Sequence, residues 1–188
     1  MDVLEQAIVF AVEAHKGMVR KGERSPYILH PMEVASIAST MTKDKEIMAA
    51  AALHDVVEDA GVPLDVLKER FGDRVAELVE SESEDKRNDR PPEDTWQLRK
   101  QESLNVLKES KDMGVKILWL SDKLANMRSF YRNYLKNGNV LWKDFNQKDP
   151  RKQEWYYRSV AEAVSELKEF PAWEEFNYLI DKVFEDNQ

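Results

Sequence analysis

The sequence contains no cysteine and no hydrophobic run long enough to span a membrane. Without thiolates, any metal site must be built from imidazole and oxygen ligands, and disulfides are excluded. A membrane helix needs about 18 consecutive apolar residues, and the acidic start MDVLEQAIVF is unlike a basic secretory signal. The chain also lacks a glycine-rich phosphate loop and a serine or cysteine nucleophile motif. We therefore expect a soluble, cytoplasmic protein that does not engage a membrane.

Positive charge is also scarce, because 28 Lys and Arg face 36 Asp and Glu, which gives a net charge of −8. A chain of this charge repels nucleic-acid backbones, so nucleic acid is not an expected partner. An anionic small molecule would have to meet a local basic patch. With 42% hydrophobic content over 188 residues, the chain can bury one core, and we expect a single domain over 1–188. The sequence leaves open whether this domain forms a homo-oligomer.

Apolar residues recur at helical spacing through most of the chain, and no period-2 strand pattern is present. The fold class is therefore predicted to be all-α, a bundle of about eight or nine helices. The charged segment 84–96, with its two prolines, is predicted to be a mobile loop that could act as a flap. The clearest helices are expected over 2–16, from about His30, over 44–61, on both sides of Gly72, over 94–110, over 114–135 and from about Pro171.

The most informative stretch is 44–61, DKEIMAAAALHDVVEDAG, where ionisable side chains interrupt an alanine-rich helix. Residues three and four apart share a helix face, so His54, Asp55, Glu58 and Asp59 are expected on roughly one turn. One imidazole with three carboxylates suits a divalent metal, such as Mn, Fe(II), Zn or Ni, beside a general acid or base. A purely structural His54–Asp55 pair, with Glu58 and Asp59 in solvent, is the alternative for so short a motif.

A second polar pattern lies in the buried helix expected over 114–135, where Asp122, Asn126 and Ser129 follow one face. A buried carboxylate needs a partner, because an unpaired buried charge is costly. Asp122 would complete a metal site with positions open for water and substrate. The alternative is a salt bridge from Asp122 to a nearby Lys or Arg. The complete ligand set would be two imidazoles and two carboxylates: His30, His54, Asp55 and Asp122.

Other candidate residues have plain structural interpretations. His15 at the end of the first helix favours a capping role, and the adjacent cations Arg20 and Lys21 are typical of a solvated surface. The aromatic residues between 142 and 157 indicate packing rather than a platform for stacking bases.

Five ordered blocks carry a family resemblance: AVEAHKGMVRKGE, SPYILHPMEVA, AAALHDVVEDAGV, RFGDRVAELVES and ILWLSDKLANMRS. Together they resemble the hydrolase domain of the RelA/SpoT family, and most closely the small alarmone hydrolases, a branch of the HD phosphohydrolase superfamily. The resemblance covers nearly the whole chain, including a tail rich in Trp and Tyr over 141–157, so no synthetase or regulatory domain is expected. It implies removal of the 3′-pyrophosphate from the stringent-response alarmones (p)ppGpp or (p)ppApp.

The resemblance also implies roles for particular residues. Glu58 and Asp59 would position the attacking water and handle protons. The metal, usually Mn(II) in this family, would be held by His30, His54, Asp55 and Asp122. The substrate-binding residues would be Arg20, Lys21, Lys86, Asn126 and Ser129.

Several features depart from the family pattern. Lys21 and His30 are separated by one residue more than is common, SES at 81–83 replaces the more usual valine-threonine sequence, and the segment between 87 and 95 is longer and more charged than expected. These departures concern the base and the flap, so guanine and adenine substrates stay open. Two alternative functions also stay open: an HD-family nucleotidase acting on ordinary nucleotides, and an alarmone sensor that binds without hydrolysis.

Overall fold

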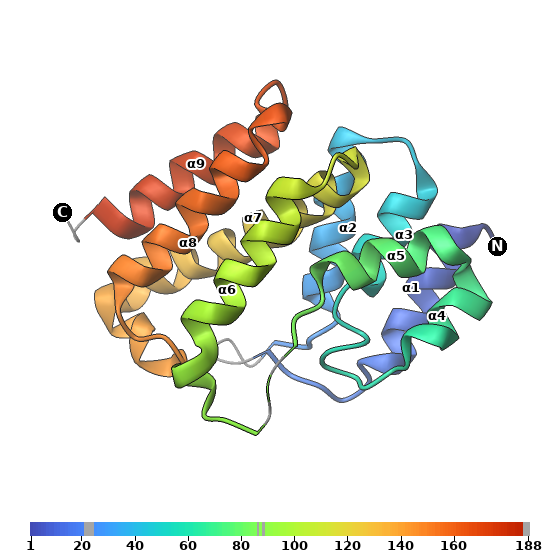
Figure 1. Ribbon diagram of the computed structural model, residues 1–188, viewed down its shortest axis with the longest axis horizontal. Helices are drawn as coiled ribbons and strands as arrows, with labels where there is room; N and C mark the ends of the chain where they lie inside the picture. Colours follow the sequence, from blue (N-terminus) through green and yellow to red (C-terminus); the bar gives the residue numbers. More distant parts are fainter. Residues whose placement is uncertain (21–24, 86, 88, 186–188) are drawn as a thin grey trace.

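The computed structural model describes residues 1–20, 25–85, 87 and 89–185, and these ranges form nine α-helices and two short 3₁₀ helices (Figure 1). Within them, extended pairing is limited to an isolated antiparallel bridge between Val19 and Pro26. The prediction of an all-α bundle is confirmed. The elements are α1 Val3–Ala14, α2 Leu29–Met41, α3 Lys45–Leu53, α4 Leu64–Phe71, α5 Asp73–Glu82, α6 Pro92–Glu109, α7 Met113–Asn137, η1 Gly138–Asp144, α8 Pro150–Ala163, η2 Ser165–Leu167 and α9 Pro171–Phe184.

The longest helix, α7, lies at the centre of the bundle and packs against α2, α3, α5, α8 and α9. At one end of the molecule, α8 and α9 pair with each other, while α1, α3, α4 and α5 gather at the other (Figure 1). The start of α1 and the end of α9 lie at opposite ends of the long axis (Figure 1). Asp112 begins α7 by accepting a hydrogen bond from the Gly114 N–H at 2.8 Å, and Arg74 of α5 binds the same carboxylate. The two helices are thereby fixed together at the start of α7.

The central stretch ends its helix earlier than its sequence predicts. The alanine-rich half forms α3, buried between α1, α2 and α5, but residues 54–60 are turns that close at Gly61. The prediction of helix over all of 44–61 is therefore wrong for its second half. Tight bonds such as Val56 N–H to the Leu53 carbonyl at 3.0 Å replace the regular helix. One hydrogen bond with the spacing of an α-helix remains, from the Asp59 N–H to the Asp55 carbonyl at 2.9 Å.

The charged segment is also shorter than expected, because α6 begins at Pro92 and takes the second half of 84–96 into a helix. Proline is well suited to the first turn, where its missing N–H costs no hydrogen bond. On α6, Leu104 and Leu107 are buried, whereas Leu98 lies on the outer face and is 46% exposed. Lys86 and Asn88 lie outside the described residues.

The aromatic residues of the last third pack against α7. Phe130 meets Trp142, Phe145 and Tyr157 edge to face, with ring centroids 5.0 to 5.6 Å apart. Trp142 in turn stacks on Phe184 of α9 at 5.3 Å. The interpretation of these residues as packing is confirmed. None of the described helices combines the length and hydrophobicity needed to cross a lipid bilayer.

We expect Phe176→Ala to lower the free energy of unfolding by about 3 to 5 kcal/mol, because Phe176 is fully buried in α9 and its removal leaves a cavity. Urea denaturation followed by circular dichroism measures the change. Tyr178→Ala is the matched control on the same helix: Tyr178 is 55% exposed, so a change within about 0.5 kcal/mol is expected. Equal losses in the two variants would contradict this account of the core.

Candidate metal centre

Three buried side chains from three separate elements, one of them α7, converge at one point. His30 lies in the first turn of α2, His54 caps the end of α3, and Asp122 lies in the middle of α7. Their ligand atoms all fall within 4.8 Å of one another. Asp122 Oδ1 is 3.0 Å from His30 Nε2 and 3.5 Å from His54 Nε2. Ligands bound to one metal at about 2.1 Å lie roughly 3.0 to 3.4 Å apart, so this spacing fits a shared ion.

Asp55 adds a second carboxylate to this group. Its Oδ2 is 3.1 Å from His54 Nε2 and 3.5 Å from His30 Nε2. The structure thus brings together all four side chains that the sequence singles out as metal ligands. That all four bind a single ion stays a prediction.

The chemistry of His54 fits a metal ligand. Its Nδ1 is 2.9 Å from the Ala51 carbonyl oxygen, a contact that requires a proton on Nδ1 and leaves Nε2 as the ring atom that faces the centre. Nε2 is buried and, although it lies 3.1 Å from Asp55 Oδ2, makes no aligned hydrogen bond to the described residues. Burial alone would lower the pKa of His54, but Asp55 and Asp122 raise it well above its ordinary value. The pocket therefore favours positive charge at the point where a cation would bind.

The two oxygens of Asp122 have different partners. Oδ1 faces the imidazoles and accepts a hydrogen bond from Asn126 Nδ2 at 2.8 Å, while Oδ2 accepts one from Lys123 Nζ at 2.5 Å. Burial opposes a charge on Asp122, but Lys123 and the two histidines hold its pKa well below its usual range. The metal interpretation and the salt-bridge interpretation of Asp122 are therefore both compatible with the structure, since they use different oxygens.

Neither Lys123 nor its contact with Glu82 is predicted from the sequence. Burial would lower the pKa of Lys123, but Asp122, Tyr156 and Glu82 raise it, so the ammonium stays charged. Glu82, at the end of α5, accepts a hydrogen bond from Lys123 at 3.0 Å. Burial raises the pKa of Glu82 to about 8, although Lys123 opposes the change.

Glu58 and Asp59 are held in two different ways. The Tyr27 hydroxyl lies 2.7 Å from Asp55 Oδ2 and 2.6 Å from Asp59 Oδ2, which links Asp59 to the metal centre. Burial and the Asp55 charge raise the pKa of Tyr27, so it stays a neutral donor. Glu58 Oε1 instead accepts a hydrogen bond from the Glu84 backbone N–H at 2.6 Å.

Sequence reasoning missed Tyr27, although its position three residues before His30 places it one turn away. The buried His15 ring stacks on the Tyr27 ring, with centroids 4.9 Å apart, and helps to fix its orientation. His15 does end α1, as expected, but its backbone rather than its ring makes the capping bond, from its N–H to the Ala11 carbonyl.

A cleft of about 260 Å³ opens beside the centre, with His30 in its wall. The Arg20 guanidinium donates to Asn126 Oδ1, and Asn126 donates to Asp122, so the cleft is tied to the metal ligands. Of the predicted substrate residues, Arg20 and Ser129 line this cleft, while Lys21 and Lys86 lie outside the described residues. The lining consists of Arg20, Ser25, Leu29, His30, Glu33, Ala125, Ser129 and Arg132.

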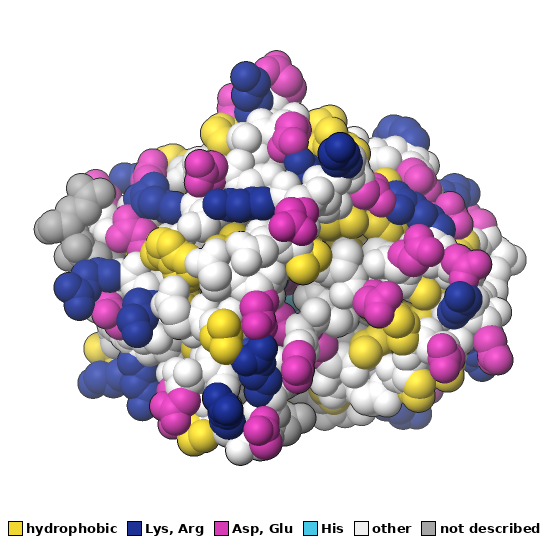
Figure 2. Space-filling model, in the orientation of Figure 1, with side chains coloured by type: hydrophobic (Ala, Val, Ile, Leu, Met, Phe, Trp, Pro, Cys, Tyr) yellow, Lys and Arg dark blue, Asp and Glu magenta, His cyan; other side chains and the backbone are white. Residues whose placement is uncertain are grey.

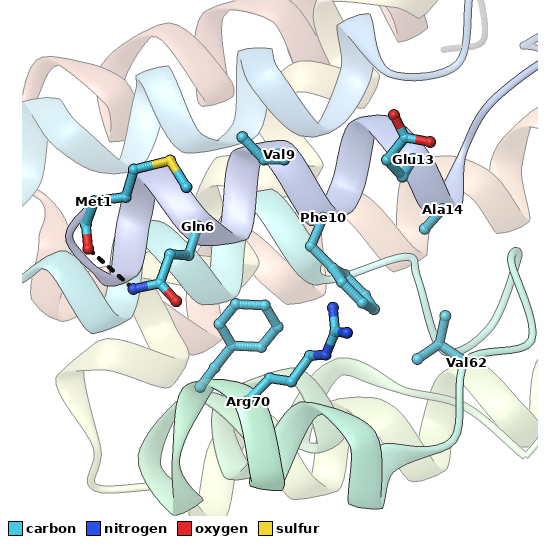
Figure 3. Close-up of a pocket in the computed structure, with 9 residues that line it drawn as sticks. Met1, Gln6, Val9, Phe10, Glu13, Ala14, Val62 and Arg70 are labelled. Carbon is cyan, nitrogen blue, oxygen red and sulfur yellow. Dashed lines mark hydrogen bonds between the residues drawn. The ribbon is translucent and has the colours of Figure 1, made fainter.

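A larger hollow of about 590 Å³ lies between α1 and α4 (Figure 3). Phe10 and Phe71 form part of its wall, and the Arg70 guanidinium lies 5.1 Å from the Phe10 ring centroid. None of the predicted site residues lines it. On the face shown in Figure 2, basic and acidic side chains are interspersed rather than gathered by sign. The site is therefore identified by its ligand chemistry and not by the size of a hollow or by a large charged patch.

Comparison with known proteins agrees with this geometry. The model of the HD domain family matches residues 7–142, a segment that contains every residue of the centre. The chain belongs to the HD domain family. An HD-domain hydrolase implies a divalent metal, and the buried His30, His54 and Asp122 group supplies ligands for one.

Curated relatives include two guanosine-3′,5′-bis(diphosphate) 3′-pyrophosphohydrolases. That of Vibrio cholerae is 39% identical over 132 residues, which is 69% of this chain and 18% of the relative. That of Aquifex aeolicus is 37% identical over 129 residues, 68% of this chain and 18% of the relative. The bifunctional (p)ppGpp synthase/hydrolase SpoT of Escherichia coli K12 is 37% identical over 129 residues, which is 67% of this chain and 18% of the relative. The HD-family chain thus matches less than a fifth of the length of these relatives.

Solved structures give the same fold. A metazoan orthologue of SpoT that hydrolyses ppGpp has a TM-score of 0.73 at 22% identity, covering 100% of this chain and 96% of that one. The protein lmo0812 of Listeria monocytogenes has a TM-score of 0.71 at 28% identity, covering 83% of this chain and 99% of that one.

We expect Mn(II) to stabilise the wild-type protein and Asp59→Ala, but to lose most of this effect in Asp55→Ala. Both carboxylates contact Tyr27, yet only Asp55 lies within 3.5 Å of the imidazole nitrogens. At a hundredfold excess over its dissociation constant, a ligand adds about 2.7 kcal/mol of stability. Thermal unfolding with Mn(II) and with EDTA measures the shift. An equal metal response in the two variants would remove Asp55 from the ligand set.

Proposed function

We propose that this chain is a metal-dependent hydrolase that removes the 3′-pyrophosphate from (p)ppGpp or (p)ppApp. The products would be GDP or GTP, or their adenine equivalents, and pyrophosphate. The observation that carries the proposal is the buried group of His30, His54 and Asp122 in an HD-family chain. Relatives 37 to 39% identical to it are named as 3′-pyrophosphohydrolases of guanosine 3′,5′-bis(diphosphate). In this proposal residues 1–188 act as one hydrolase domain.

The proposed metal is Mn(II), held by His30, His54, Asp55 and Asp122. Two imidazole nitrogens with carboxylate oxygens suit Mn(II), although another divalent metal could take the same donors. Such an ion lowers the pKa of a water molecule and polarises a phosphoryl oxygen when it is bound.

Glu58 and Asp59 are the proposed acid and base. The water oxygen would form a bond to the phosphorus that is joined to the 3′ oxygen. The bond between this phosphorus and the 3′ oxygen would break, and a proton would pass to the 3′ oxygen. These two residues would orient the water and supply that proton. Tyr27 supports the proposal by linking Asp59 to Asp55, and the Glu84 N–H supports it by fixing one oxygen of Glu58.

The cleft is the proposed binding site for the nucleotide. Its arginines, Arg20 and Arg132, offer the local positive charge that an anionic substrate needs in a chain of net charge −8. Asn126 and Ser129 would contact the nucleoside, and Lys21 and Lys86 would contribute further charge.

Incubation of the purified protein with guanosine and adenosine 3′,5′-bis(diphosphates) tests the proposal. With Mn(II) we expect release of pyrophosphate, resolved by anion exchange, and with EDTA we expect none. Cleavage of phosphate from the 5′ end of ordinary nucleotides would instead establish a nucleotidase. Tight alarmone binding with no cleavage would establish a sensor.

We expect Asp59→Asn to lower kcat by about 10² to 10⁴, the usual contribution of a positioned acid or base, while Mn(II) affinity stays close to wild type. Single-turnover assays and metal titration separate the two effects. Asp65→Asn, an exposed carboxylate on α4, is the control and should leave both unchanged. Full turnover in Asp59→Asn would remove Asp59 from the chemical step.

A further inference from the structure

A buried cation lies directly behind the proposed metal ligand Asp122. Lys123 Nζ is 2.5 Å from Asp122 Oδ2 and 3.0 Å from Glu82 Oε1. It also lies 4.8 Å from the Trp119 ring centroid, within the range of a cation–π contact. Its side chain is only 12% exposed. The ammonium is therefore held on several sides and has little freedom to leave the carboxylate.

Because of this ammonium, the two oxygens of the Asp122 carboxylate have different surroundings. Oδ1 faces the two imidazoles, at 3.0 Å from His30 Nε2 and 3.5 Å from His54 Nε2. Oδ2 carries the ammonium. A carboxylate that binds a metal through both oxygens must offer both lone-pair edges to the same ion. With Lys123 Nζ 2.5 Å from Oδ2, a metal bound through that oxygen as well would place two cations on it, so Oδ1 is the favoured ligand atom.

We propose that Lys123, fixed by Glu82, is a positioning residue that keeps Asp122 a one-oxygen ligand and so leaves a coordination position open for water or substrate. This inference rests on the proposed metal-dependent function. Outer partners of this kind orient metal ligands in many sites, and their loss commonly changes affinity or activity by about 10- to 100-fold.

The role of Glu82 is to hold the ammonium in place. Glu82 is buried at the end of α5, so its contact fixes Lys123 to an element outside α7. The ring of Trp119, one turn before Lys123 on α7, covers another side of the ammonium. The lysine thus cannot follow Asp122 if the carboxylate rotates.

A purely structural role makes a different prediction. Buried ion pairs contribute little net stability, and apolar replacements of similar size are often tolerated when the partner charge is compensated. Asp122 would keep the imidazoles, Asn126 and the bound metal as partners without Lys123. Stability and metal geometry can therefore be separated by experiment.

The matched variants are Lys123→Met and Lys116→Met. Lys116 is a second buried lysine on α7, but it pairs with Glu166 and contacts no predicted metal ligand. Each variant removes one buried ammonium from the same helix. Lys123→Arg restores a cation, and Glu82→Leu removes the acceptor that fixes the lysine.

Mn(II) alone is the probe, and water-proton relaxation counts the exchangeable waters on the bound ion. We expect Lys123→Met to lose one such water and at least tenfold in kcat, and Lys116→Met to match wild type. Lys123→Arg should recover the water count, and Glu82→Leu should fall between Lys123→Met and wild type. An unchanged water count in a folded Lys123→Met, or an equal loss in Lys116→Met, would overturn the inference. If Lys123→Met does not fold, an unchanged count in Glu82→Leu overturns it.

The metal measurement is independent of substrate. If the wild-type protein binds Mn(II) but cleaves no alarmone, the proposed function fails, and the water count still tests Lys123. If the wild-type protein binds no Mn(II), the inference about Lys123 is overturned as well.

Discussion

A carboxylate buried in the middle of the central helix imposes the strongest constraint on this molecule. Asp122 is 4% exposed, and a lone charge at such a position would be strongly unfavourable. Both oxygens of its carboxylate have stabilising partners: imidazoles from α2 and α3 lie near one oxygen, and an ammonium lies near the other. The position of these helices around α7 is therefore tied to the electrostatics of one residue as well as to apolar packing.

The early end of α3 has a functional consequence. A helix continued to Gly61 would place His54, Asp55, Glu58 and Asp59 on fixed faces of one cylinder. The turns at 54–60 instead direct Asp55 to the imidazoles while Glu58 reaches the Glu84 N–H at the end of α5. A single short stretch would then supply the proposed metal ligands to one side and the proposed acid or base groups to another. Tyr27 contacts both Asp55 and Asp59 and so fixes the two sets of side chains relative to each other.

Much of this site was predictable because its residue types are unusual where they occur. Histidine and aspartate stand out in an apolar helix, and Asp122 stands out in a buried one, so the sequence alone indicates three of the four expected ligands. His30, at the start of its helix, gains meaning only as a second imidazole beside them. Tyr27 and Lys123 gave no such signal, because a tyrosine in a loop and a lysine beside an aspartate are common. Their roles depend on contacts with Asp59 and Glu82, which only the tertiary structure brings close.

The helix boundaries show the same division. The periodicity of α7 and the glycine between α4 and α5 are local signals, and the structure follows them. The end of α3 is decided by side chains that find partners on other elements, as Glu58 does at Glu84. The start of α6 at Pro92 could not be located from the sequence, because charged residues and proline favour a loop as well as a first helical turn. Local pattern thus fixes where a helix exists, and tertiary contacts decide where it stops.

The charge balance leads to a final physical argument. A chain of net charge −8 repels an alarmone at long range, but this repulsion is screened beyond about 8 Å at physiological ionic strength. Within that distance, Arg20 and Arg132 share the cleft lining with the acidic Glu33, so protein charge alone gives the substrate only a modest local attraction. A divalent ion at His30, in the wall of the same cleft, would add the largest positive charge nearby. In the proposed enzyme, the metal would thus contribute to substrate binding as well as to chemistry, and the two binding events would be thermodynamically coupled.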